Sequence, residues 1–137
     1  MRTQPQIDAI QRAIDRHSYG VYELGKHDCA ILAADCMMAL GCPDPMAEVR
    51  GYYHSARQLS RLLTSLGYRG KLGFVEAWCE RNEYPRIPSW ATQVGDLGLT
   101  RDMGFCVRTS RTFISIASSG LLVSVEPVHS WAIQWTQ

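Results

Sequence analysis

The segment ELGKHDCAILAADC, residues 23–36, decides how the chain folds, because a helix start and a reactive side chain coincide in it. Asp28 is a preferred N-cap residue, and residues 30–40 are rich in strong helix formers. Gly41 and Pro43 then end the helix. Apolar side chains occupy most faces of residues 30–40, so we expect this helix to be largely buried.

Cys29 directly follows the expected N-cap and therefore belongs to the first turn of this helix. Unpaired N–H groups and the helix dipole favour negative charge there, which lowers a thiol pKa and helps to hold an oxyanion. Cys29 is therefore a candidate nucleophile, and the alternative is a buried cysteine at the start of a core helix. A nucleophilic thiol also needs a base, normally a histidine. His27 is the nearest in sequence, and its alternative role is structural, with the ring bonded to a backbone carbonyl or to Asp96.

Three further helices are expected around this one. Residues 4–17 carry isoleucines at spacings of three and four, which is typical of an amphipathic helix. Ser55 is the N-cap of the next helix, which Gly67 closes. Residues 72–82 form the last, short helix, and two prolines then exclude regular structure until Trp90.

From residue 94 onward the pattern is that of short strands separated by turns. The expected strands lie within residues 95–100, 103–110, 111–118, 121–128 and 129–137. The third and fourth form a hairpin, and the last carries Trp131, Ile133 and Trp135 on one face. The sequence therefore predicts one α+β domain over residues 1–137, with N-terminal helices packed on a C-terminal antiparallel sheet.

Composition excludes several classes of protein. A formal net charge of +1 gives no reason to expect a nucleic-acid or membrane partner. The first fifteen residues lack the apolar centre of a signal peptide, so we expect synthesis in the cytoplasm. The five cysteines are odd in number and contain no C-x-x-C pair, so neither a disulfide framework nor a metal site is expected, and no cofactor is implied. Cys36, Cys79 and Cys106 stand among apolar residues and are expected to be reduced and buried.

Several motifs, in this order, resemble the NlpC/P60 cysteine peptidases. They are an aromatic-x-x-Gly loop, an Asp-Cys-Ala helix start and a Gly-Asp-hydrophobic strand, at residues 22–25, 28–30 and 95–97. The chain is still more similar to short NlpC/P60-like proteins encoded in phage and prophage tail modules, over roughly residues 19–133. The shared elements there are residues 27–30, 33–35, 44–45, 50–52, 95–96, 120–121 and Trp131. This resemblance implies a papain-like fold with Cys29 in the nucleophile's position.

One departure from that family concerns the base. Active members carry the catalytic histidine as His-hydrophobic-Gly-hydrophobic after the Gly-Asp strand, and alignment on Gly104 places Asp102 there. An aspartate cannot replace an imidazole base, and its negative charge raises the pKa of a nearby thiol. Among the other histidines, His129 belongs to a different element, His54 is expected in a solvated loop and His17 at a helix C-terminus.

Residues 50–53, Arg-Gly-Tyr-Tyr, form the most prominent loop motif. Arginine and tyrosine are favoured at protein interfaces, so Arg50 and Tyr52 are candidate binding residues. In the alternative, Arg50 pairs with Asp44 or Glu48 and tyrosine rings cover the helix ends. Trp135, close to the chain end, is a third candidate for burial by a partner.

Two functions follow as expectations from the resemblance. The first is a structural or assembly protein of the phage tail tip, carried in the virion, whose catalytic set has decayed and which bridges hub and distal tail proteins. The second is a working cysteine peptidase or amidase that cleaves peptidoglycan peptides during tail penetration. A stand-alone host cysteine hydrolase is a third reading.

Overall fold

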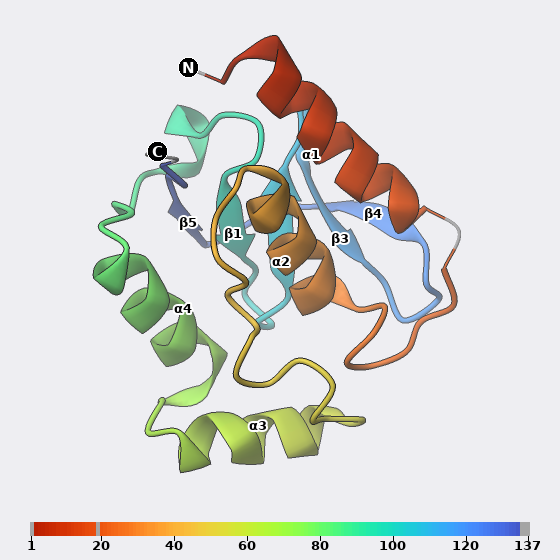
Figure 1. The fold of residues 1–137 in the computed structure, drawn as a ribbon, viewed down its shortest axis with the longest axis vertical. Helices are drawn as coiled ribbons and strands as arrows, with labels where there is room; N and C mark the ends of the chain where they lie inside the picture. Colours follow the sequence, from red (N-terminus) through yellow and green to blue (C-terminus); the bar gives the residue numbers. More distant parts are fainter. Residues whose placement is uncertain (1, 19, 135–137) are drawn as a thin grey trace.

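The computed structural model describes residues 2–18 and 20–134 and shows an α+β fold (Figure 1). Four α-helices come first: α1 (Gln4–Arg16), α2 (Cys29–Ala39), α3 (Ala56–Ser65) and α4 (Gly70–Arg81), followed by a short 3-10 helix, η1 (Ser89–Ala91). Five strands follow: β1 (Leu97–Leu99), β2 (Phe105–Arg108), β3 (Phe113–Ile116), β4 (Leu122–Val125) and β5 (His129–Trp131). The predicted class, helices first and an antiparallel sheet after, is confirmed.

Local capping explains where the first three helices begin. Thr3 forms a capping box with Gln6 at the start of α1. Asp28 caps α2 and Ser55 caps α3, each through a side-chain oxygen that accepts a backbone N–H, as predicted. The prediction for α4 was two residues late. This helix starts at Gly70, whose φ of +67° suits glycine, and no side chain caps it.

The strands form one antiparallel sheet in the order β4-β3-β2-β1-β5. The predicted β3–β4 hairpin is confirmed, with Ile114 opposite Ser124. The last strand is shorter than predicted, because β5 ends at Trp131, although Ile133 beyond it is buried as well. The predicted position of Trp135 lies outside the described residues.

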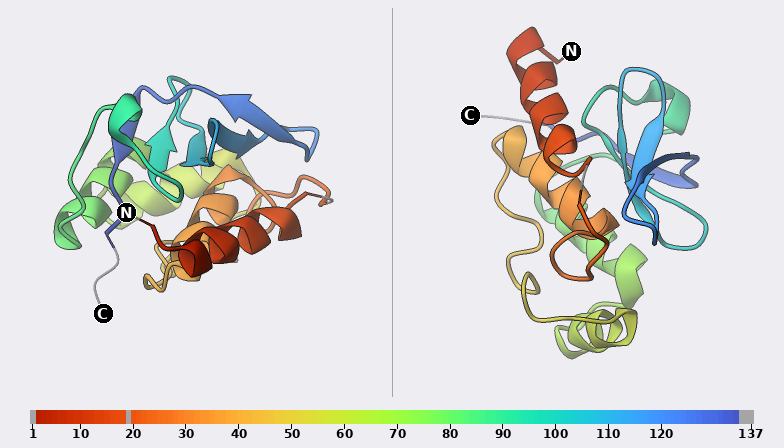
Figure 2. Two further views of the ribbon diagram at one scale, coloured as in Figure 1. Left: turned by 90° about the horizontal axis from the view of Figure 1, so that it is seen from above. Right: turned by 90° about the vertical axis from the view of Figure 1, so that its right-hand side faces the viewer.

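Helix α2 lies at the centre of the molecule. It packs on β2 and β3 on one side and on α1 on the other, and α3 packs on α4 (Figures 1 and 2). As expected from its apolar composition, most of α2 is buried. Cys36, Cys79 and Cys106 are buried and free, also as predicted. The sheet therefore has a helix-covered face, and the first residue of α2, Cys29, lies against Phe105, the first residue of the central strand β2.

Candidate functional site

Asp28 fixes the loop that presents Cys29. Its carboxylate is buried, with one oxygen accepting from Ile31 N at 2.9 Å and the other from Gly25 N and Tyr53 Oη, both at 2.7 Å. The bond to Gly25 holds the loop before α2 against the start of the helix. The bond to Tyr53 connects the loop and the helix start to a segment more than twenty residues later. Cys29 is therefore held rigidly at the N-terminus of α2.

The Cys29 thiol is partly buried and has one hydrogen-bond partner among the described residues, the backbone N–H of Phe105 at 3.4 Å. Burial is the main influence on its pKa and raises it above the ordinary value. The Phe105 N–H and the positive charge of Lys71 act in the opposite direction, and the negative charge of Asp28 adds to the rise. The net result is a thiol that stays protonated at neutral pH.

Lys71, near the start of α4, is a neighbour of this thiol that the sequence did not indicate. Its Nζ donates to Met103 O at 3.3 Å and lies 5.8 Å from the centroid of the Phe105 ring. Residues 103–105 therefore contact both the ammonium and the thiol. No motif surrounds Lys71, so only the packing of α4 beside β2 reveals it.

Asp102, the residue aligned with the family's histidine, is exposed and bound within its own turn. Its carboxylate accepts from Thr100 Oγ1, which is the main reason why its pKa lies below the usual value. Thr100 Oγ1 in turn accepts from Gly104 N at 2.9 Å. The Asp102 side chain is thus an anion on a turn rather than a hydrogen-bond partner of Cys29.

Both ring nitrogens of His27 have partners other than Cys29. Its Nε2 lies 3.1 Å from Gly120 O, at the tip of the β3–β4 hairpin, and its Nδ1 lies 3.2 Å from His17 Nδ1. The bond to a backbone carbonyl is one of the two structural alternatives expected from the sequence; the other, a bond to Asp96, is not formed. The catalytic pairing of Cys29 with His27 stays a prediction, and these contacts argue against it.

The hydrogen-bond partners place one proton on each of the two rings. A carbonyl only accepts, so His27 Nε2 donates to Gly120 O, and one of the two facing Nδ1 atoms donates to the other. The other nitrogen of His17 lies 2.7 Å from a carboxylate oxygen of Asp35 and donates to it. The contacts of His17 therefore join the end of α1 to the loop before α2 and to α2 itself.

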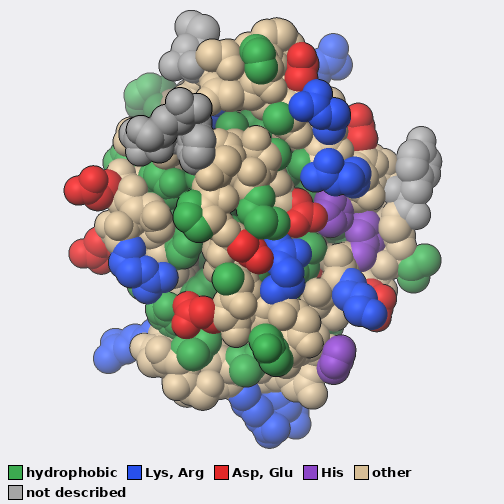
Figure 3. All heavy atoms as spheres, in the orientation of Figure 1, with side chains coloured by type: hydrophobic (Ala, Val, Ile, Leu, Met, Phe, Trp, Pro, Cys, Tyr) green, Lys and Arg blue, Asp and Glu red, His purple; other side chains and the backbone are tan. Residues whose placement is uncertain are grey.

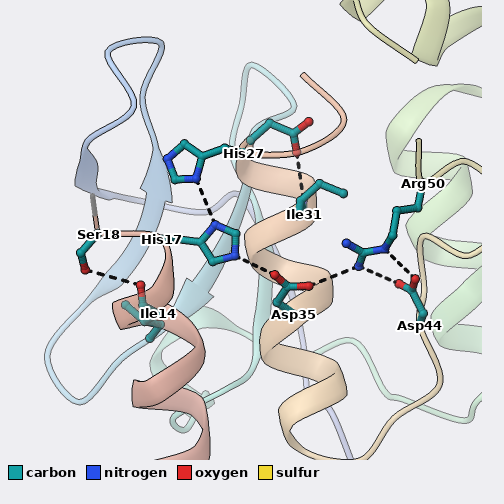
Figure 4. A network of polar contacts seen from close by, with 9 residues as sticks. Ile14, His17, Ser18, His27, Ile31, Asp35, Asp44 and Arg50 are labelled. Atoms are coloured by element: carbon teal, nitrogen blue, oxygen red, sulfur yellow. Dashed lines mark hydrogen bonds and ion pairs between the residues drawn. The ribbon is translucent and has the colours of Figure 1, made fainter. Parts of the chain in front are cut away.

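The chain of contacts continues from Asp35 to the loop before α3 (Figure 4). Arg50 Nη2 lies 3.3 Å from Asp35, and Arg50 binds Asp44 with two nitrogens at 2.7 and 3.1 Å. The expected Arg50–Asp44 pair is therefore present, with Asp35 as an additional partner. We call residues His27, His17, Asp35, Arg50 and Asp44 the polar chain. Figure 3 shows histidine, arginine and acidic side chains gathered on this face of the molecule.

The candidate binding residues differ in exposure. Tyr52 is 70% exposed and, with residues on α3, borders a shallow hollow. Arg50 is partly buried by the polar chain, and Tyr53 is fully buried. Trp135 lies outside the described residues, so its role as an interface residue stays a prediction.

The remaining histidines do not complete a catalytic pair either. His54 is exposed, as expected for a loop residue. His129 lies in β5 opposite Leu99, and its buried Nδ1 has no hydrogen-bond partner within residues 2–18 and 20–134. In the same part of the chain, no three His, Cys, Asp or Glu side chains are close enough together to hold a metal ion. No helix described there is long and apolar enough to span a bilayer.

Fold and site together define an α+β protein with a partly buried cysteine at the N-terminus of its central helix. Residues 1–136 match a family model described as a domain of unknown function, DUF6950, and the chain belongs to that family. Searches of curated proteins and of solved structures gave no match.

Proposed function

We propose that this protein is a structural or assembly component of a phage tail tip, with an NlpC/P60-like fold that no longer hydrolyses peptides. In this role it bridges hub and distal tail proteins and is carried in the virion. The order of elements supports the fold assignment: a cysteine begins the central helix, and Gly95-Asp96 precedes the first strand of the antiparallel sheet. The assignment rests on the resemblance of motifs described above.

The observation that carries the proposal is the separation of the cysteine from an imidazole. A cysteine hydrolase needs a base within hydrogen-bonding reach of the thiol. Cys29 Sγ receives only the N–H of Phe105 among the described residues, while the nearest histidine in sequence, His27, is held by His17 and Gly120. A thiol with a raised pKa and no base is a poor nucleophile, so a scaffold role accounts better for these contacts.

Tyr52 and Arg50 are the surface that we assign to a tail partner. Tyr52 offers a large exposed ring, and Arg50 is fixed by two carboxylates, which leaves little side-chain entropy to lose on binding. The neighbouring hollow beside α3 gives the partner room for a side chain.

Co-expression with the hub and distal tail proteins of a tail module tests this role. We expect a complex that survives size-exclusion chromatography and that Tyr52→Ala weakens about tenfold, as for a modest interface hot spot. Leu66→Ala truncates an exposed side chain at the end of α3 that does not line this hollow; it is the control and should bind as the wild type does. A protein that stays monomeric and binds neither tail component would refute the assembly role.

A cysteine peptidase or amidase is the second candidate, and one observation favours it. Cys29 begins a helix, where the dipole favours a thiolate, and the positive charge of Lys71 lowers the thiol pKa in the same sense. Incubation with peptidoglycan peptides separates the two functions. Hydrolysis by the wild type that Cys29→Ser abolishes would establish the enzyme, whereas no turnover by either is the expected result.

A further inference from the structure

A groove crosses the side of the molecule away from the polar chain. It consists of two hollows of about 320 and 210 Å³ that share Ser89 and Pro127 in their walls. Arg86 and His129 line the first hollow, and Trp90, Arg108 and Arg111 line the second. Because the two hollows share walls, a ligand longer than one side chain can lie in both.

The second hollow lies on the outer face of the sheet. Arg108 is opposite Phe113, and Phe113 is opposite Val125, so these three side chains lie on one face. Val107, next to Arg108, points the other way into the core that α2 covers. Figure 2 shows α1 and α2 together on one side of the sheet. The groove is therefore separate from Cys29 and does not depend on whether that residue is catalytic.

Trp90 gives the groove an exposed aromatic surface. Its side chain, on η1, is 84% exposed, although burial of so large an aromatic ring is normally favourable. The indole of Trp90 does not pack in the hydrophobic core. Binding hot spots are enriched in tryptophan and arginine, and an apolar side chain or a peptide plane of a partner can pack on the flat indole ring.

Two arginines of the second hollow, Arg108 and Arg111, have no carboxylate within ion-pair distance among the described residues. Arg108 Nε donates to the carbonyl of Thr109 at 2.7 Å, and the Arg111 side chain makes no hydrogen bond within that part of the chain. The guanidinium of Arg86 lies instead over the Trp131 ring, at 5.5 Å from its centroid. The remaining N–H groups of Arg108 and Arg111 are free to bind carboxylates in a forked geometry.

Two arginines elsewhere in the chain are held in ion pairs. Arg2 and Arg50 are each paired with carboxylates at 3.3 Å or less. The second hollow instead holds the unpaired guanidinium groups of Arg108 and Arg111, and Glu126 is the one acid among the described residues of the groove walls. The charge of the groove is complementary to a ligand that carries several carboxylates.

We propose that this groove binds an extended acidic peptide segment of a partner protein. Carboxylates of the segment bind Arg108 and Arg111, and an apolar or aromatic side chain of the segment packs on Trp90. A nucleic acid fits less well, because the phosphate backbone needs a broad basic surface, whereas the chain has a net charge of only +1 and Glu126 lies within the groove.

Titration of the isotope-labelled protein, followed by NMR, tests the proposal. The probe is a short synthetic peptide of glutamate, aspartate and phenylalanine, blocked at both ends. Its matched control has glutamine and asparagine in place of the acids. We expect the acidic peptide to shift the Trp90 indole N–H and the amides of residues 108–113, with a dissociation constant below about 1 mM that weakens with added salt. The amide control should bind at least about tenfold more weakly.

Variants locate the binding to the groove. Trp90→Ala and Arg111→Glu should each weaken the acidic peptide at least about tenfold, and both positions are exposed, so neither change disturbs the core. Arg57→Glu, the same charge reversal on α3, should leave binding within about twofold. The proposal is overturned if the acidic peptide gives no shift at Trp90 up to about 1 mM. It is equally overturned if the shifts lie elsewhere, or if a lysine-rich peptide or a single-stranded oligonucleotide binds as tightly.

Discussion

At the scale of single residues, the hydroxyl of Tyr53 determines how well a buried charge is satisfied. Asp28 is 2% exposed, and its carboxylate is stabilised by two backbone N–H groups and by Tyr53 Oη. Burial, together with the negative charge of Asp28, raises the pKa of Tyr53 far above its usual value. The tyrosine is therefore a permanent donor to the carboxylate that caps α2.

Tyr53→Phe removes that donor without removing the ring. We expect a loss of about 1.5–3 kcal/mol in the free energy of unfolding, because a buried carboxylate loses a charged hydrogen bond. Urea denaturation with an unchanged m-value measures it. Tyr52→Phe is the control at an exposed neighbour and should change stability by less than about 0.5 kcal/mol. Equal effects of the two changes would contradict this role of Tyr53.

The protonated state of Cys29 gives a second prediction at this scale. Because burial raises the thiol pKa, alkylation by iodoacetamide should be slower near neutral pH than that of a free cysteine peptide, with a midpoint at higher pH than that of the peptide. Lys71→Met removes a positive charge that lowers this pKa, so the midpoint should move to still higher pH. Mass spectrometry of the Cys29 peptide across a pH series measures the rate.

The control for this change is Lys26→Met, which removes an exposed lysine that pairs with Glu23 instead. It should leave the alkylation midpoint where it is in the wild type. A midpoint below that of the free cysteine peptide would contradict the protonated thiol and would favour the hydrolase. An unchanged midpoint in Lys71→Met would show that this lysine does not act on Cys29.

These residues also show what sequence can predict at a site. Asp28 was identifiable as a helix cap because capping depends on residues within one turn. Tyr53 and Lys71 were not, because each reaches the site through the packing of a distant element. The contacts of His17 were hidden for the same reason, because only the fold brings its partners His27 and Asp35 near.

At the scale of elements, the polar chain connects α1, α2 and the loop before α3. His17 ends α1, Asp35 lies on α2, and Arg50 with Asp44 belongs to the loop. Burial acts to raise the pKa of Asp44, but the bonds from Arg50 and from Met46 N–H outweigh it and leave the pKa below its usual range. An ion pair with two bonds in this partly buried place contributes to holding the loop on α2.

Arg50→Met should therefore destabilise the protein by about 1–2 kcal/mol at neutral pH, since two carboxylates lose a partly buried partner. The pKa of folded Asp44 lies below the unfolded value, so its contribution is present above about pH 4 and is lost as the pH falls through the folded pKa. The difference between wild type and variant should accordingly shrink in acid. Unfolding in urea at several pH values measures this.

Arg57→Met, on the exposed surface of α3, provides the comparison and should cost less than about 0.5 kcal/mol at any of these pH values. A loss in Arg50→Met that stays constant down to about pH 2 would show that it arises from packing of the arginine stem and not from the ion pair.

Elements were predicted well where their signals are local. The caps and apolar stripes located α1 to α3, and the alternation and turn residues located the β3–β4 hairpin. The uncapped start of α4 gave no such signal. The pairing of β5 with β1 joins segments about thirty residues apart, and strand order of this kind depends on tertiary packing that no short window of sequence contains.

At the scale of the whole molecule, Arg2 joins the beginning of the chain to the start and end of the sheet. Its guanidinium donates to Asp96 at 2.9 Å, to Val94 O at 2.8 Å and to Ile133 O at 2.6 Å. The side chains of Arg2 and Asp96 are only 7% and 1% exposed. Asp96 belongs to the Gly-Asp motif seen in the sequence, but its partner at the opposite end of the chain was not predicted.

Removal of this arginine leaves a buried carboxylate without its cation. Burial already raises the pKa of Asp96, and the charge of Arg2 counteracts that rise, so Arg2→Met should raise the pKa further. We expect the free energy of unfolding to fall by about 3 kcal/mol at neutral pH. The carboxylate of Asp96 must then either stay ionised in the interior without a cation or take up a proton, and both are unfavourable.

The sign of the pH dependence distinguishes this cause from lost packing. In Arg2→Met the folded state binds a proton that the unfolded state does not, so stability should recover as the pH falls from about 7 towards 5. Urea unfolding at both pH values measures the recovery, and Arg12→Met, an exposed arginine of α1, should show neither loss nor recovery. A deficit of the same size at both pH values would mean that Arg2 stabilises the fold through its contacts with Val94 and Ile133 alone, and that Asp96 needs no cation.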